Sequence, residues 1–109
     1  MGKWAQYRKR GSSSGTAAPL GPPPTPTFTN EAGTLYVRAT GADDTGGSYE
    51  AEISSDGGAT WAPESNFPWS AAHLFGDSGD YAGSWLRARE NGNLITYLGT
   101  SPWSIALVV

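Results

Sequence analysis

Residues 48–61 read Ser-Tyr-Glu-Ala-Glu-Ile-Ser-Ser-Asp-Gly-Gly-Ala-Thr-Trp and carry the clearest structural signal in the chain. Its first half alternates apolar Tyr49 and Ile53 with acidic Glu50 and Glu52. A period of two in hydrophobicity is typical of a half-buried antiparallel strand, with the two carboxylates on the solvent side. Glycines follow directly and favour a turn into a second strand. The stretch therefore predicts a β-hairpin.

The second half of this stretch, residues 54–61, matches the Asp-box pattern Ser-x-Asp-x-Gly-x-Thr-Trp, known from sialidase propellers and other β proteins. The Asp56 carboxylate can accept N–H groups of the turn, Gly58 tolerates a positive φ, and Trp61 can cover the hairpin. A propeller needs several blades, and this chain contains one copy of the pattern. We therefore expect Asp56, Gly58 and Trp61 to form a structural turn, and we do not expect Asp56 to be a catalytic acid.

Further alternating stretches flank the hairpin, at residues 34–40, 84–90 and 103–109. In the last of them, Ile105 is expected to share one face with the aromatic and aliphatic residues on either side. Residues 63–82 alternate less clearly, and we expect one short strand there, around His73–Phe75, between loops. No run of ten residues has helical periodicity. Six or seven short strands predict an all-β fold, an antiparallel β-sandwich.

The composition agrees with a single small domain. The chain has 109 residues, 38% of them apolar, with 15 glycines, 8 prolines and no cysteine. Disulfides and thiolate metal sites are therefore excluded. No stretch approaches the roughly 20 apolar residues that a membrane-spanning helix needs. Glycine-rich loops are expected at residues 41–47, and a tight turn is expected at residues 90–93.

The first ten residues differ in charge from the rest of the chain, and the residues that follow them differ in composition from the domain. Residues 1–10 hold four of the seven Lys and Arg and no acid (+4), whereas the rest holds three Arg against ten acids (−7), which together give the net charge of −3. A Gly/Ser/Pro-rich stretch follows to residue 25. We predict that residues 1–25 are an extended basic arm and linker, disordered in the isolated protein, and that residues 26–109 form the β-sandwich domain. An apolar region of the kind that follows the basic start of a signal peptide is missing, so we expect no secretion signal.

The arm mixes cations with two aromatic residues and is the first candidate binding segment. A protein-docking peptide is the preferred interpretation, with aromatic anchors and cations that meet an acidic protein surface. Its candidate partner-binding residues are Lys3, Trp4, Tyr7, Arg8, Lys9 and Arg10. Nucleic-acid binding is an alternative, because cations neutralise phosphates and aromatic rings stack on bases. Four charges make a small footprint, and the acidic body opposes it.

The order of elements resembles a fibronectin type III or related immunoglobulin-like domain. The residues that carry the resemblance are the stretch 34–40, the hairpin 49–61, the run Leu-Arg-Ala-Arg-Glu-Asn-Gly at 86–92 and Thr-Ser-Pro-Trp-Ser at 100–104. Ser84 stands where the family's corner tyrosine would fall. Small bacteriophage virion proteins, such as capsid decoration, tail or fibre-associated subunits, often use this fold. The resemblance implies a non-enzymatic structural protein, made in the host cytoplasm and found in the virion with other subunits, including copies of itself.

A carbohydrate- or surface-binding module is the main alternative function. Phe67, Trp69 and Trp85 are candidates for an aromatic platform on which sugar rings stack. Core packing is the other interpretation of these rings. His73 has no nucleophile motif beside it, so no enzyme activity and no cofactor are expected. Asp43, Asp44, Asp77 and Asp80 stand in glycine-rich stretches and raise the alternative of a calcium site, although the run from Asp77 to Asp80 does not match the EF-hand spacing.

Overall fold

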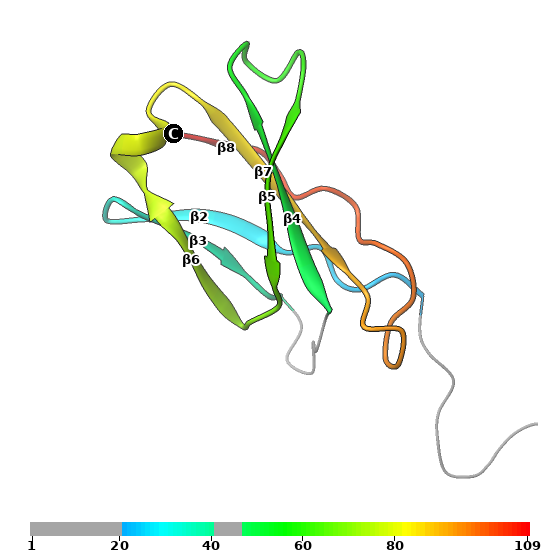
Figure 1. Ribbon diagram of the computed structural model, residues 1–109. Helices are drawn as coiled ribbons and strands as arrows, with labels where there is room; N and C mark the ends of the chain where they lie inside the picture. Colours follow the sequence, from blue (N-terminus) through cyan, green and yellow to red (C-terminus); the bar gives the residue numbers. More distant parts are fainter. Residues whose placement is uncertain (1–20, 41–46) are drawn as a thin grey trace, which may run out of the picture.

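The computed structural model describes residues 21–40 and 47–109, which form two antiparallel sheets (Figure 1). One sheet has the strand order β2 (Thr27–Glu31), β3 (Thr34–Arg38) and β6 (Ala72–Asp77). The other has the order β5 (Ala62–Pro68), β4 (Ser48–Ser54), β7 (Trp85–Asn91) and β8 (Leu107–Val108). A single turn of 3-10 helix, η2 (Ser78–Tyr81), follows β6. The predicted all-β class is confirmed. Residues 1–20 of the predicted arm lie outside the described residues.

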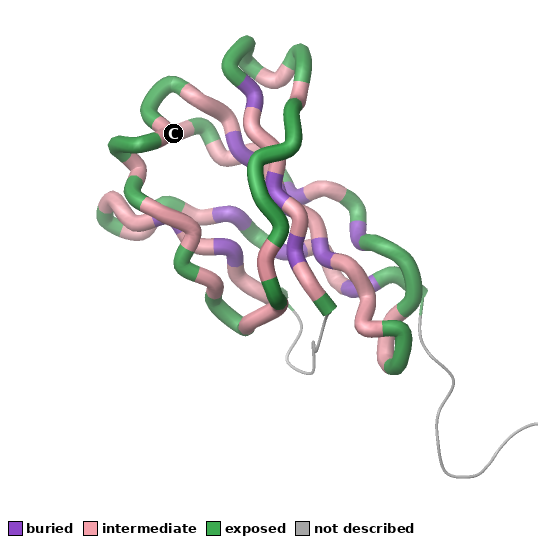
Figure 2. The backbone as a smooth tube through the Cα atoms, viewed as in Figure 1, coloured by how far each residue is buried: buried purple, intermediate pink, exposed green. Residues whose placement is uncertain are grey.

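The two sheets pack face to face around a small core (Figure 2). Alternation along β3, β4 and β7 supplies this core, as the sequence predicts, because every second side chain of a strand points to the same side. Strand β4 has the bounds expected for it, and β7 is shifted by one residue. The buried apolar residues are Phe28, Leu35, Val37, Tyr49, Ala51, Leu86 and Ala88.

The edge strands β2 and β5 are not apparent from the alternation. In β5, which runs from Ala62 to Pro68, six of the seven residues are exposed and only Phe67 is half-buried. A strand at a sheet edge with little buried surface has no reason to alternate in hydrophobicity. β2 is short and mixes threonines with Phe28, the one residue of this strand that reaches the core.

The C-terminal segment differs from the predicted continuous strand over residues 103–109. Only Leu107–Val108 are in strand conformation, and Ile105 is 92% exposed rather than packed with its neighbours. Before β8, two serines connect the segment to β7, each through its backbone N–H and its hydroxyl group. Ser101 donates its backbone N–H to the Glu90 carbonyl (2.8 Å), while its Oγ accepts the Glu90 N–H (2.9 Å). In the same way, the Ser104 N–H donates to the Ala88 carbonyl (2.7 Å), and the Ser104 Oγ accepts the Ala88 N–H (3.0 Å).

The turn predicted at residues 90–93 is also wrong. β7 continues through Asn91, and the Gly92 N–H bonds to the Gly99 carbonyl at 2.7 Å, which closes a longer loop over residues 92–99. The Asn93 Oδ1 organises this loop, because it accepts backbone N–H groups from Ile95 (2.8 Å) and Thr96 (2.7 Å). An asparagine side chain of this kind imitates a backbone turn, so the loop is longer than the Asn-Gly pair suggests.

The start of the domain lies earlier than the composition predicts. Residues 21–25 were expected to belong to the linker, yet Pro23 is buried and the Gly21 carbonyl accepts the Leu98 N–H at 3.2 Å. The Thr40 hydroxyl also donates to the Thr25 carbonyl at 2.8 Å. Proline can cover apolar surface without a backbone N–H that needs a partner. Pro23 therefore packs on the domain, while Gly21 and Pro22 are exposed and Gly21 is held to the domain through its carbonyl.

Candidate functional site

The hairpin turn at residues 54–61 is held by the Asp56 carboxylate. Its Oδ1 accepts the Thr60 N–H at 2.9 Å and the Ser54 hydroxyl at 2.7 Å, and its Oδ2 accepts the Thr60 hydroxyl. These bonds, those from Thr60 foremost, lower the pKa of Asp56 to about 2. Gly58 has a φ of +88°, and a Cβ there would lie 3.0 Å from the Trp85 ring. The carboxylate is engaged within its own turn, which suits the structural role expected for Asp56 and Gly58.

The outer face of the four-stranded sheet carries a stack of arginines and tryptophans. The Arg87 guanidinium carbon lies 4.2 Å from the ring centre of Trp61 and 4.4 Å from that of Trp103. Arg89 lies 4.5 Å from the same Trp103 ring. Cation–π contacts of this geometry hold charges and ring faces together. Trp61 therefore covers its own domain at this face.

Carboxylates from the neighbouring strand complete this face. Glu52 pairs with Arg87 at 2.6 Å, and Glu50 pairs with Arg89 at 3.0 Å. The two glutamates share one side of β4, as the alternation predicts, and both are half-buried. The charges of this face pair with one another, and the guanidinium groups lie over its tryptophan rings. These contacts stabilise the sheet, and they occupy the charged groups and ring faces that a ligand on this face would have to bind.

The structure does not bring the three residues of the predicted aromatic platform together. Phe67 lies opposite the buried Tyr49, with ring centres 5.6 Å apart, so it belongs to the core side of the sheet. Trp69 also packs against the core. Trp85 lies opposite Ser54, which is five residues after Tyr49 on β4. Five residues of a strand rise about 17 Å, and an odd number of steps places Trp85 on the face opposite to that of Phe67. No single sugar ring can contact all three side chains.

His73 lies beside this core group rather than in a reactive cluster. Its ring stacks on Phe67 with centres 3.9 Å apart and an angle of 13° between the planes. Burial lowers the pKa of His73, which favours the neutral imidazole. A neutral ring stacked on an aromatic side chain is a packing arrangement.

Of the acidic residues expected in a loop, Asp77 ends β6 and Asp80 lies within the 3-10 turn. Tyr81 donates its hydroxyl to Glu64 at 3.2 Å, and burial together with the charges of Glu64 and Asp80 raises the pKa of Tyr81. Within residues 21–40 and 47–109, no group of three or more His, Cys, Asp or Glu side chains is placed to hold a metal ion. The other two candidate calcium ligands, Asp43 and Asp44, lie outside the described residues.

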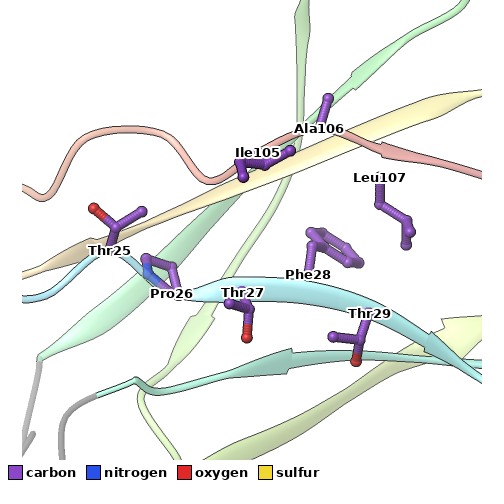
Figure 3. A pocket seen from close by; sticks show the side chains of 8 residues that line it. All are labelled: Thr25, Pro26, Thr27, Phe28, Thr29, Ile105, Ala106 and Leu107. Carbon is purple, nitrogen blue, oxygen red and sulfur yellow. The ribbon is translucent and has the colours of Figure 1, made fainter.

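An apolar groove between the two sheets is the feature that sequence reasoning missed. Residues 25–29 form one side and residues 105–107 form the other, around a volume of about 460 Å³ (Figure 3). Phe28 and Leu107 point toward one another across this gap in Figure 3. Ile105 stands at its rim, 92% exposed. In the sequence, the groove is indicated by one isoleucine between Ser104 and an alanine, and alternation predicts this residue on the apolar face of the strand expected at residues 103–109.

A second exposed apolar group lies on the loop over residues 92–99. Leu94 and Ile95 are each 72% exposed, and Leu98 is 46% exposed. The loop is held by the side chain of Asn93, so these aliphatic side chains are presented on a defined backbone. Exposed aliphatic side chains gathered in this way are typical of contact surfaces.

Comparison with known proteins adds no family to this description. No protein-family model matches the chain, and no curated protein matches it either. In the part of the chain that the structure describes, no helix is long and apolar enough to cross a membrane.

Proposed function

We propose that this chain is a non-enzymatic structural protein that docks into a larger protein assembly through its N-terminal arm. The assembly we propose is a bacteriophage virion, in which the chain serves as a capsid decoration or a tail- or fibre-associated subunit. It is made in the host cytoplasm and contacts other protein subunits, including copies of itself.

The observation that carries this proposal is the exposure of aliphatic side chains on the sandwich. Ile105 is 92% exposed at the groove, and Leu94 and Ile95 are each 72% exposed on the loop after β7. When a partner covers exposed aliphatic side chains and an open apolar groove, apolar surface is removed from water, and this favours association. Contact with another protein is the function that such a surface supports best.

Charge distribution supports a role for the arm. Each arginine in the described residues, Arg38, Arg87 and Arg89, is already paired with a glutamate of its own domain. The other four cations of the chain all lie within residues 3–10. An acidic surface on a partner would therefore meet the arm first, which favours an oriented approach.

The virion setting rests on analogy of fold. Three strands facing four in a small antiparallel sandwich agree with the fibronectin type III-like architecture that such virion proteins often use. Function does not follow from fold, so the analogy guides the choice of experiment. The carbohydrate alternative loses its proposed site, because Phe67 and Trp85 lie on opposite faces of the sheet.

Density-gradient sedimentation of particles from producing cells tests the proposal. We expect the full chain to sediment with the particles at a constant ratio to the major subunit. Deletion of residues 1–15 should leave the chain folded, with an unchanged midpoint of thermal unfolding, yet leave it at the top of the gradient. A deleted chain that still sediments with particles would remove the arm from the proposal, and a full chain that never does so would contradict the virion role.

A further inference from the structure

We propose that the groove between residues 25–29 and residues 105–107 receives the N-terminal arm of a second copy of this chain. This inference rests on the proposed function, since it names the receptor for the arm. Trp4 and Tyr7 are the side chains that enter the groove, and the flanking cations lie along its outside.

The groove lies where both sheets end. β2 is an edge strand of the three-stranded sheet, and β8 is an edge strand of the four-stranded sheet. An edge strand presents backbone N–H and C=O groups that another extended segment can pair with. Ile105 lies between Ser104, which is bonded to Ala88 of β7, and the short ladder of Leu107 and Val108, and its side chain is 92% exposed beside the groove. The opening can thus accept an extended chain.

The chemistry of the groove selects an apolar, aromatic occupant. Its walls are formed by Pro26, Phe28, Ile105, Leu107, an alanine and the threonines of β2, without a charged side chain. Its volume of about 460 Å³ falls in the range of pockets that enclose ligand-sized groups. Aromatic side chains bury large areas for a low loss of conformational freedom, which makes them effective anchors in such a space.

The arm is the segment of this chain that offers such anchors outside the described residues. Trp4 and Tyr7 are three positions apart and are followed directly by cations. Residues 11–109 carry a charge of −7, so the +4 arm is attracted to the body of another copy. Twenty extended residues span up to about 66 Å, which is enough to reach a neighbouring domain.

The position of residues 21–25 favours a second copy over the chain's own arm. The Gly21 carbonyl is tied to Leu98, and Pro23 is buried against the same domain. These residues lead directly into Pro26 at the near end of the groove. The chain's own arm would have to turn back across this packed segment to enter, whereas an arm from outside approaches freely.

Disulfide trapping tests the inference, since the full chain contains no cysteine of its own. Equal amounts of an Ala5→Cys chain and an Ile105→Cys chain are mixed under mild oxidation, and linked peptides are identified by mass spectrometry. Leu74→Cys is the matched control, because Leu74 is a 61% exposed aliphatic residue on β6, away from the groove. We expect the 5–105 linkage to exceed the 5–74 linkage at least about tenfold, as one buried aromatic anchor would give.

Two results would overturn the inference. Equal trapping at both positions would show that the arm does not select the groove. A double Ala5→Cys, Ile105→Cys chain that forms only an intrachain link would assign the groove to the chain's own arm.

A second measurement separates the groove from the proposed function. Ile105→Asp should weaken self-association at least about tenfold in analytical ultracentrifugation, while Leu74→Asp leaves it unchanged. If deletion of residues 1–15 abolishes incorporation into particles but Ile105→Asp does not alter self-association, the groove assignment fails and the proposed function stands. If Ile105→Asp weakens self-association but the full chain never sediments with particles, the virion role fails and the groove remains a site of self-association.

Discussion

Asp56 shows how much one side chain can determine locally. Its two carboxylate oxygens accept bonds from Thr60 and from the Ser54 hydroxyl, and Ser54 in turn accepts the Gly58 N–H at 2.9 Å. All partners lie within four residues, so the contacts follow from the local sequence without help from the rest of the fold. For this reason the role of Asp56 was predictable from the pattern alone.

Substitution of Asp56 should loosen the turn. We expect Asp56→Ala to lower the midpoint of thermal unfolding, because the Thr60 N–H and hydroxyl lose their acceptor. Asp56→Asn, which keeps one carbonyl oxygen, should lower it less. Circular dichroism measures both. If Asp56→Ala left stability intact but abolished association with partners, the residue would belong to a binding site instead.

Glu31 predicts a pH dependence of stability. Its bonds to Arg38, and then to Thr29, lower the pKa of Glu31 from 4.5 to about 2. A carboxylate with a lowered folded-state pKa contributes stability above its unfolded pKa, and that contribution disappears as the pH falls through the folded value. Urea unfolding should therefore show a loss of stability between about pH 4.5 and 2. Glu31→Gln should flatten that part of the curve, and an unchanged slope in this variant would contradict the assignment.

At the scale of elements, predictability follows burial. Strands that alternate between core and solvent, such as β3 and β4, were found within a few residues of their bounds, because burial imposes the period. The exposed edge strand β5 carries no such constraint. The segment before β8 differs in the opposite way. Its sequence alternates like a strand, but it contacts β7 through the backbone N–H and hydroxyl groups of Ser101 and Ser104 and not through a continuous ladder.

These two serines are expected to contribute measurably to stability. Ser104 is 7% exposed, and its hydroxyl accepts the buried Ala88 N–H at 3.0 Å. Ser104→Ala leaves that donor without an acceptor, which costs about 1–3 kcal/mol in the free energy of unfolding. Ser65→Ala, on the exposed strand β5, serves as the control and should change little. A Ser104→Ala chain as stable as the control would show that water replaces the hydroxyl.

The candidate site was the least predictable part of the molecule. Phe67 and Trp85 looked like one platform because both are aromatic residues in a small domain, but their register on β4 places them on opposite faces. The groove is formed by segments about 80 residues apart, residues 25–29 and 105–107. Such a meeting of distant segments depends on how the two sheets pack, which periodicity alone does not encode.

At the scale of the whole molecule, the domain satisfies most of its polar groups internally and exposes aliphatic ones. The arginine and tryptophan side chains of the outer face contact one another, and the proposed contact surfaces are the groove at Ile105 and the loop over residues 92–99. This division predicts that a glycan array probed with the isolated protein gives no reproducible binding.

The same arrangement predicts that Trp69→Ala lowers thermal stability, because Trp69 packs against the core. A glycan signal lost in folded Trp69→Ala would favour the carbohydrate alternative.

Hydrogen–deuterium exchange of the chain, free and in its assembly, distinguishes docking through the arm and the groove from docking through another surface. If the arm and the groove are the docking surfaces, amide exchange should slow in residues 1–15 and 105–108 upon assembly. Exchange in the paired centre of β4 and β7 should stay the same, because those amides are already bonded within the sheet. Protection confined to the hairpin at residues 54–61, with the arm and residues 105–108 unchanged, would contradict the account.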